Sequence, residues 1–386
     1  MNFAFNEEQE ELRRSVRRFL EDKSASPEVR RLMDTPEGYD PAVWAQMGRE
    51  LGLQGLHIPE AYGGQGFTFV ELIGVLEEMG RALLCAPFFS SVCLAANALL
   101  NGGTEEHKAK LLPGIASGEE IATLALTESS GDWGPTGIAM EAAADGSGYR
   151  LSGTKTFVLD GHVADLLLVA ARRPGTSGAE GVSLFAVRGD SEGLARRRLA
   201  TMDQTRKQAQ LVFSGVAAEL VGEEGGAWPG LSKTLDQAAA CLSAEMVGGA
   251  QLCLDMAVEY AKVRVQFGRP IGSFQAIKHK CAEMLLQVES ARSAAYYAGW
   301  TATQEALSAD AASHEPSELP AVASLAKAYC SEAYFYAAAE NIQIHGGIGF
   351  TWEHDAHLYF KRAKSSEVLL GDPTYHRELL AQRIGI

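Results

Sequence analysis

Apolar residues recur at three- and four-residue spacing through the first 120 residues, which is the pattern of amphipathic helices. The segment FVELIGVLEEMGRALL at 69–84 has this spacing, and SSVCLAANALLNGG at 90–103 ends on paired glycines that suit a helix C-terminus. The pattern predicts an N-terminal α-helical domain over residues 1–120.

From Ile121 the helical spacing gives way to short apolar runs separated by clusters of Gly, Asp, Ser and Pro. Such runs between turn residues predict β-strands. We expect a middle domain over residues 121–227 that folds as a small β-barrel or sandwich. The runs that carry this prediction are IATLALTE, LLLVAAR, VSLFAVRG and AQLVFSGV.

A helical pattern returns after the linker-like segment GEEGGAWPG, where an apolar stripe runs from Leu231 to Val263. Further long helices are predicted over 273–308, 317–345 and 354–382, with the polar stretch SADAASHEPSELP as a loop. Four long amphipathic helices with short connections predict a four-helix bundle over residues 228–386.

Composition narrows the class of protein. With 386 residues, 46% of them hydrophobic, the chain can form two or three domains. No apolar run approaches the roughly 18 residues of a membrane span, and the N-terminus is too charged for a secretory signal, so we expect a cytoplasmic protein without membrane insertion. The net charge of −15 disfavours nucleic acid and anionic membranes as partners.

The cysteines and histidines predict no metal site. The six cysteines have no CxxC spacing, which favours free thiols over disulfides or structural zinc. His354, Asp355 and His357 are close in sequence, but this spacing is common on solvated helix faces. A ferritin-like di-iron bundle is excluded because its Glu-x-x-His motifs are absent.

Five segments, in order, resemble those of the acyl-CoA dehydrogenase family. The chain is similar to it in ATLALTESSGDWGPTG, RVQFGRPIGSFQAIKHKCAEM and QIHGGIGFTWEHDAHLYFKRAK, and also in the opening FNEEQEELRRSVRRFL and the stretch GLHIPEAYGGQGF. The resemblance covers nearly the whole chain. It implies the acyl-CoA dehydrogenase fold of a helical domain, a β domain and a helical bundle.

The resemblance also implies FAD as cofactor. The Ser- and Gly-rich turn after IATLALTE lets backbone N–H groups approach a flat ring, and a guanidinium at Arg264 could grip a pyrophosphate. On the residues alone, a plain turn, a solvated arginine and a bare helix C-cap remain alternatives. By resemblance, the FAD-binding residues are Leu126, Thr127, Asp132, Trp133, Phe157, Val158, Leu159, Arg264, Phe267, Gln275, Gln343, Gly346 and Gly347.

The family's catalytic base is missing. In the commonest branch a Glu lies 27 residues after the Gln of QxxGG, where this chain has Leu370. In a second branch the Glu lies 26 residues before the Arg of RxxFG, where this chain has Ala238. Neither side chain accepts a proton, so the catalytic residue is unknown. The resemblance implies that Asp236, Leu370 and Gly371 contact substrate.

Other family positions on the subunit's own active centre are also changed. Ala239 replaces an arginine, Leu159 replaces a threonine that contacts flavin, and Trp133 replaces a serine of the flavin loop. By contrast, Arg264 and QxxGG, which the family offers across a subunit interface, are intact. This asymmetry resembles the heterotetrameric acyl-CoA dehydrogenases of bacterial sterol side-chain breakdown, in which one of two related chains supplies the base.

The sequence therefore predicts FAD-dependent dehydrogenation of an acyl-CoA thioester by a base-lacking subunit of a hetero-oligomer, with electron-transfer flavoprotein or a similar acceptor. Three alternatives remain. The chain could be a self-sufficient homo-oligomer whose base is displaced to Glu367, Asp372 or Glu245. It could be a flavin oxidase or monooxygenase on the same fold. It could also be a non-catalytic assembly subunit.

Overall fold

The computed structural model describes residues 5–146, 148–308 and 317–386, so most of the stretch SADAASHEPSELP lies outside the described residues. The chain packs into two compact units. We call residues 5–30, 69–84 and 239–386 the bundle unit, and residues 31–68 and 85–238 the barrel unit. Segments of the first 120 residues contribute to both units, and the domain bounds at 120 and 227 stay a prediction.

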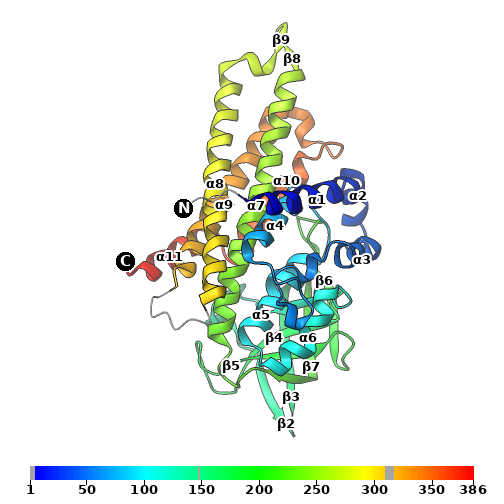
Figure 1. The fold of residues 1–386 in the computed structure, drawn as a ribbon, viewed down its shortest axis with the longest axis vertical. Coiled ribbons are helices and arrows are strands. Elements are labelled where there is room, and N and C mark those ends of the chain that lie inside the picture. The colour runs from blue at the N-terminus through cyan, green and yellow to red at the C-terminus, as the bar shows by residue number, and fades with distance from the viewer. Residues whose placement is uncertain (1–4, 147, 309–316) are drawn as a thin grey trace. The chain divides into compact units, whose positions relative to one another are not determined.

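The bundle unit is helical (Figure 1). The helices of this unit are α1 (Glu7–Lys23), α4 (Phe69–Arg81), most of α7 (Trp228–Val263), α8 (Gln275–Ser308), α9 (Leu319–His345), the 3₁₀ turn η6 (Gly346–Phe350), α10 (Ala356–Val368) and α11 (Pro373–Ile384). Between α7 and α8, at their far end, lies a short hairpin of β8 (Val265–Gln266) and β9 (Arg269–Pro270), followed by the 3₁₀ turn η5 (Ile271–Ser273).

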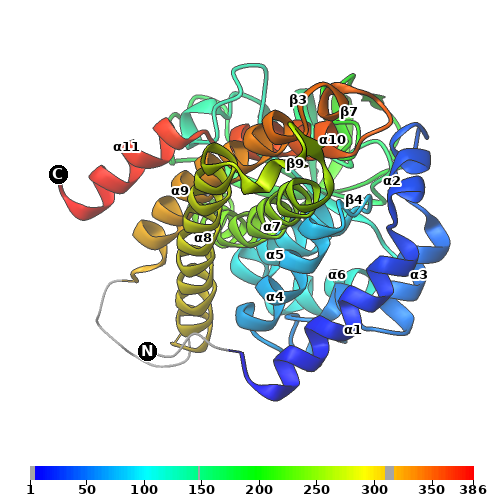
Figure 2. The ribbon, with the colours of Figure 1, turned by 90° about the horizontal axis from the view of Figure 1, so that it is seen from above.

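The predicted helices over 273–308 and 317–345 are confirmed by α8 and α9. The single helix predicted over 354–382 is wrong, because the chain breaks between α10 and α11. Leu370 and Gly371 have φ values of 64° and 105°, which end a helix. Asp372 then caps α11 by accepting the N–H of Tyr375 at 2.8 Å, one residue before Pro373. Figure 2 shows the C-terminal end of α11 extending away from α8 and α9.

Helices α4 and α7 touch backbone to backbone. A Cβ atom added at Gly80 would lie 1.9 Å from the carbonyl oxygen of Glu245, and one at Gly248 would lie 1.8 Å from that of Glu77. No side chain fits at such distances. The two glycines therefore allow a segment from the N-terminal part of the chain to pack directly on the central helix of the bundle.

This contact places Glu77 in a buried polar cluster. Its carboxylate accepts a hydrogen bond from the Tyr296 hydroxyl at 2.6 Å, is ion-paired with Arg292 of α8, and lies 3.3 Å from Arg13 of α1. Burial together with Glu77 raises the pKa of the Tyr296 phenol, so the hydroxyl remains a donor. Glu77 thereby links α1, α4 and α8 through charged hydrogen bonds.

The barrel unit contains a sheet, which has seven strands among the described residues. The order is β1-β4-β2-β3-β7-β5, and β5 pairs again with β4, so five of the strands close into a ring while β6 pairs with β7. The strands are β1 (Ala122–Ala125), β2 (Glu141–Asp145), β3 (Gly148–Leu159), β4 (Leu166–Arg172), β5 (Val182–Arg188), β6 (Leu194–Arg198) and β7 (Gln208–Val221).

The four apolar runs of the β segment form β1, β4, β5 and β7, as expected. The sequence analysis did not predict β2, β3 and β6, because none of them is a continuous apolar run. Their exposed positions carry charged or small polar residues. The helical parts of the unit are α2 (Ser26–Met33, shared with the bundle unit), α3 (Pro41–Arg49), η1 (Leu53–Gly55), η2 (Glu60–Tyr62), η3 (Phe89–Ala96, a π-helix), α5 (Asn97–Gly102), α6 (Glu105–Ser117) and η4 (Pro135–Gly137).

Helix α7 is long and apolar enough to cross a membrane, but 72% of its most apolar window is buried inside the protein. The core helix of a soluble protein has the same properties. The six cysteines, all among the described residues, are free thiols, and five of them are buried.

We expect Gly80→Ala to destabilise the bundle unit by roughly 2 kcal/mol or more, because the added methyl group would overlap the carbonyl of Glu245. Urea denaturation followed by circular dichroism measures this loss. Gly102→Ala is the matched control, since a Cβ there meets nothing within 4 Å. Equal stability of the two variants would contradict the close packing of α4 and α7.

Candidate active site

Two segments expected to line the flavin lie together in the barrel unit. The Thr127 hydroxyl donates to the carbonyl of Thr156 at 2.7 Å, and the N–H of Thr156 donates to the carbonyl of Thr127 at 3.0 Å. Earlier in β1, the Thr123 hydroxyl donates to the carbonyl of Leu159 at 2.6 Å. The end of β1 and the end of β3 thus lie side by side.

The side chains of these two strand ends differ in exposure. Leu126, Thr127, Val158 and Leu159 are buried, whereas Phe157 is 43% exposed. Phe157 has a φ of 58°, a conformation that a bulky residue rarely adopts and that needs support from its surroundings. That support comes from hydrogen bonds at the neighbouring residues.

A buried lysine connects the two segments. Lys155 is completely buried, and its ammonium donates to the carbonyl of Leu126 at 2.9 Å and to the Glu128 carboxylate at 2.7 Å. The same oxygen of Glu128 accepts the N–H groups of Ala139 and Met140 at 3.0 and 2.9 Å. Burial lowers the pKa of Lys155 to about 8, although Glu128 acts in the opposite direction.

The turn that follows is held by Asp132. Its carboxylate accepts the N–H of Gly134 at 2.7 Å and the hydroxyl of Thr136 at 2.8 Å. These bonds occupy both oxygens locally, so Asp132 shapes the turn. Trp133 is half-buried beside it. At Gly131, with a φ of 70°, a Cβ would meet nothing within 4 Å, so the turn leaves open space.

The remaining FAD-binding candidates lie at one end of the bundle unit. Arg264, Phe267, Gln275, Gln343 and Gly347 are exposed, and Phe267, at the hairpin tip, is 91% exposed. Among the described residues, the Arg264 guanidinium has no hydrogen-bond or ion-pair partner, and a Cβ at Gly346 or Gly347 would meet nothing within 4 Å.

A ring contact joins the ends of the two helices that carry these residues. Tyr260, one turn before Arg264 on α7, stacks on His345, at the end of α9, with ring centroids 4.2 Å apart. His345 also hydrogen-bonds the carbonyl of Asn341 at 2.8 Å, and burial lowers its pKa. His345 is therefore a packed, neutral histidine that holds QxxGG next to the end of α7.

The two family base positions hold buried aliphatic side chains. Leu370 lies in the bundle unit between α10 and α11, next to Gly371, and is 3% exposed. Ala238 lies within α7, in its part that belongs to the barrel unit, and is fully buried. The nearby Asp236 is also buried. No carboxylate occupies either position.

Each displaced base candidate already has a partner. Glu245 is buried and ion-paired with Arg362 at 2.9 Å. Glu367 accepts from Lys364 at 2.8 Å, and Asp372 caps α11. Moving Glu245 out of its pair would leave a buried guanidinium with less compensation, which is costly.

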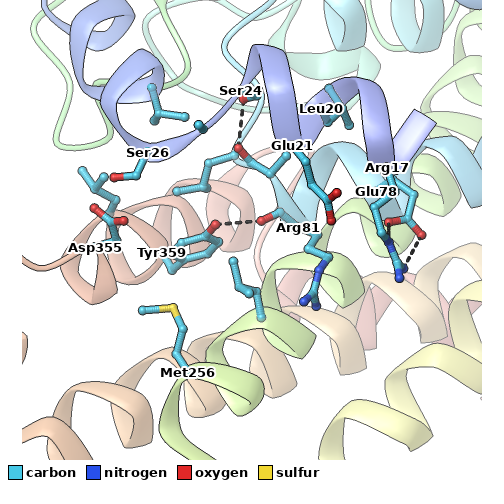
Figure 3. A pocket seen from close by; sticks show the side chains of 16 residues that line it. Arg17, Leu20, Glu21, Ser24, Ser26, Glu78, Arg81, Met256, Asp355 and Tyr359 are labelled. Carbon is cyan, nitrogen blue, oxygen red and sulfur yellow. Dashed lines mark hydrogen bonds and ion pairs between the residues drawn. The ribbon is translucent and has the colours of Figure 1, made fainter. Parts of the chain in front are cut away.

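Figure 3 shows a pocket of about 440 Å³ within the bundle unit. None of the expected site residues lines it. Several of its polar groups already have partners, since Arg17 binds Glu78 at 2.8 Å and the Tyr359 hydroxyl donates to the carbonyl of Arg81 at 2.7 Å.

The residues with metal-like spacing are also engaged. Asp355 is ion-paired with Arg30 at 2.6 Å, and a ring nitrogen of His354 accepts the N–H of Ala356 at 3.1 Å. Among the described residues, no group of three or more His, Cys, Asp or Glu side chains could hold a metal ion.

Comparison with known proteins identifies the class. Family models of the acyl-CoA dehydrogenase N-terminal, middle and C-terminal domains match residues 6–119, 123–216 and 225–385. The acyl-CoA dehydrogenase IpdE2 of Mycolicibacterium smegmatis is 36% identical, with 95% of this chain and 96% of that protein covered. The chain belongs to the acyl-CoA dehydrogenase family and is an oxidoreductase with that family's three-domain fold.

One similar solved structure is a complex, and another is described as a steroid ACAD. The ChsE4–ChsE5 complex from Mycobacterium tuberculosis contains a chain with a TM-score of 0.86 and 29% identity, covering 100% of this chain and 99% of that one. A variant of a Tcur3481–Tcur3483 steroid ACAD gives a TM-score of 0.84 and 30% identity, with 98% of each chain covered.

The residues present fit the flavin that the family implies. An exposed arginine with no partner among the described residues suits a pyrophosphate, and the open space at Gly346 and Gly347 allows close approach to backbone. The resemblance named these residues. It did not name Lys155, whose only sequence signal is a lysine inside a run of strand residues.

We expect Lys155→Met to destabilise the protein by about 3 kcal/mol, because it leaves Glu128 largely buried without its cation. Urea denaturation at pH 7 measures the loss. Lys110→Met is the control, since its ion pair with Glu219 is exposed and worth less than about 1 kcal/mol.

The same residue predicts a pH dependence. Its pKa falls from the ordinary 10.5 to about 8 on folding, so the unfolded chain binds more protons between these values. The contribution of Lys155 to the free energy of unfolding must then rise with pH in that window. The rise should be smaller in Lys155→Met than in the wild type, and identical pH profiles would contradict the assignment.

Proposed function

We propose that this chain binds FAD and is the base-lacking subunit of a hetero-oligomeric acyl-CoA dehydrogenase. The observation that carries the proposal is the pair of buried aliphatic residues, Leu370 and Ala238, at the two positions where the family places its base. Contacts offered to another subunit are kept, while the proton acceptor is lost.

The proposal that the chain binds FAD rests on two sets of residues, one in each unit. In the bundle unit, Arg264 would hold the FAD pyrophosphate and QxxGG the adenosine side, toward a neighbouring subunit. In the barrel unit, Thr127 and the segment around Phe157 would lie along the flavin ring. When bound, FAD supplies the acceptor for the β-hydrogen, which leaves the acyl chain as hydride.

An oligomer is supported by the apolar surface around these residues. The hairpin, the loop after QxxGG and α8 expose large hydrophobic side chains, which a monomer would leave in water. The chain of the ChsE4–ChsE5 complex has the same fold, which supports a partner related to this chain. The exposed residues are Val263, Val265, Phe267, Leu285, Leu286, Ile348, Phe350 and Trp352.

The family indicates an acyl-CoA thioester as substrate, and the similar solved structures suggest which acyl chain to test first. The similar protein described as a steroid ACAD makes a steroid-derived acyl-CoA the first substrate to test. Electron-transfer flavoprotein or a similar acceptor would reoxidise the flavin, and a cytoplasmic location fits the soluble fold. We expect no role in binding nucleic acid, given the net charge of −15.

The alternatives make different predictions. A self-sufficient enzyme needs one of Glu245, Glu367 and Asp372 as its base, and all three are engaged as described above. An oxidase or monooxygenase would consume oxygen when substrate is added. A non-catalytic assembly subunit would purify without flavin. Anaerobic bleaching of bound FAD by acyl-CoA, in the presence of the partner, excludes the assembly subunit. The absence of oxygen consumption under air then separates dehydrogenation from the oxidase and the monooxygenase.

We expect Arg264→Ala to weaken FAD binding about 10- to 100-fold, the value of one or two charge-assisted hydrogen bonds. Flavin fluorescence after dilution measures the affinity. Arg269→Ala is the control, because that arginine lies on the same hairpin but its guanidinium sits over Phe274, 4.1 Å from the ring centroid. Unchanged affinity in a folded Arg264→Ala protein would remove the assignment.

We expect the isolated wild-type chain to dehydrogenate acyl-CoA poorly, since a general base is worth about 10²- to 10⁴-fold. A related chain that carries the base should restore turnover. Leu370→Glu should raise the rate of the isolated chain, whereas Leu370→Gln, of equal size but without a base, should not. Robust turnover by the isolated wild type that is undiminished by Glu245→Gln, Glu367→Gln or Asp372→Asn would contradict two hypotheses. These are a base supplied by a partner subunit and a base displaced to one of these three residues.

A further inference from the structure

The segment that joins α9 to α10 carries the groups assigned above to the cofactor and to the interface. We call residues 346–355 the joining segment. The paired glycines at its start are open to a ligand, and Ile348, Phe350 and Trp352 are exposed. The 3₁₀ turn η6 gives the first half of this segment regular structure. Its second half is held to the bundle unit by side chains.

Arg30 of α2 binds the joining segment on both sides of His354. Its guanidinium donates to the carbonyl of Trp352 at 2.6 Å, and to one carboxylate oxygen of Asp355 at 2.6 and 3.0 Å. The side chains of Arg30 and Asp355 are only 25% and 30% exposed, so the pair is partly shielded from water. A positive charge is therefore already fixed beside His354.

His354 connects the joining segment to α10. Its Nδ1 accepts the backbone N–H of Ala356, the first residue of α10, at 3.1 Å. Ala356 is completely buried, and its N–H has no other acceptor in the part of the chain that the structure describes. Water cannot replace the bond, so the imidazole acts as the cap of α10. Only a neutral imidazole can do this, because an imidazolium carries N–H groups on both nitrogens and accepts nothing.

A ring contact connects His354 to QxxGG. Its ring lies against that of His345, the last residue of α9, with centroids 4.3 Å apart. His345 in turn stacks on Tyr260 of α7 and immediately precedes the paired glycines. A displacement of His354 therefore reaches QxxGG through a single ring contact.

We propose that His354 is a pH switch, whose protonation breaks the cap of α10 and loosens the joining segment together with the hold of QxxGG on FAD. Protonation turns the acceptor of the Ala356 N–H into a donor. It also places a cation at a helix N-terminus and beside Arg30, and both repel it. The switch itself stands on these contacts, whereas its effect on the cofactor rests on the proposed function.

The groups around His354 set the pH range of the switch. Burial lowers the pKa of His354 from its ordinary 6.5, Asp355 opposes this shift, and His357 and Arg30 add to it. Below pH 6.5 the opened segment therefore binds more protons than the closed one. The closed state must lose stability as the pH falls through this value and keep it at higher pH.

Two other histidines of the cluster respond differently to a proton. Burial lowers the pKa of both His345 and His357, and His357 also feels the cations Lys361 and Arg30. Each of these rings bonds a carbonyl, that of Asn341 at 2.8 Å for His345 and that of Trp352 at 3.4 Å for His357. A ring that donates keeps its bond when it gains a second proton. The loss of a backbone bond on protonation is therefore specific to His354.

The test follows backbone amides of residues 346–358 by hydrogen–deuterium exchange of the full chain at pH 5, 6 and 7, corrected for intrinsic rates. In the wild type we expect protection to fall about 5- to 10-fold from pH 7 to pH 5, the value of one helix cap. His354→Asn supplies a cap acceptor that does not titrate, so its protection should change less than about 2-fold. Where this variant does not fold, His354→Ser takes its place.

Two matched variants serve as controls. His279 is exposed on α8, and His357 bonds a carbonyl, so His279→Asn and His357→Asn should both keep the fall of the wild type. Release of FAD, followed by flavin fluorescence, should be about 5- to 10-fold faster at pH 5 than at pH 7 in the wild type. In His354→Asn this acceleration should be lost.

The outcomes separate the switch from the proposed function. Protection that stays constant in the wild type, or that falls equally in His354→Asn, overturns the switch. A fall that is abolished by His357→Asn and kept in His354→Asn also overturns it, because another histidine is then responsible. Protection that responds as expected while FAD release does not overturns the effect on the cofactor. A wild type that shows the fall but holds no FAD at any pH supports the switch and overturns the proposed function.

Discussion

The backbone contact between α4 and α7 at Gly80 and Gly248 is the constraint on which the bundle unit depends. It brings Glu77 within reach of donors on α1 and α8, so that helices far apart in sequence share one buried charge cluster. A buried carboxylate is tolerated only with such partners. The N-terminal helices α1 and α4 therefore belong to the same packed body as the C-terminal bundle.

The sequence predicted those features that local pattern determines. The 3.6-residue period located α8 and α9, and the apolar runs located β1, β4, β5 and β7. The break before α11 was missed although Asp372 and Pro373 signal a helix start, because the apolar period continues across it. The contacts of Gly80 and Lys155 depend on residues distant in sequence, and no local pattern encodes them.

The candidate site shows the same division. Arg264, Gln343 and Gly347 are predicted to bind FAD by resemblance to the family, and the structure adds that they are exposed at one end of the bundle unit. Lys155 was not among the residues that the resemblance named. Its ammonium bonds the carbonyl of Leu126 and the carboxylate of Glu128, so its role is visible only once the chain is folded.

The left-handed conformation of Leu370 has a consequence for the side chain at this position. An aliphatic residue gains nothing from a φ of 64°, and the fold nevertheless keeps that geometry with buried donors on both sides. Donors from α9 and α11, and not the side chain at position 370, therefore hold this conformation. A substitution at position 370 can change the side chain that this peptide carries while the bonds that fix its backbone remain.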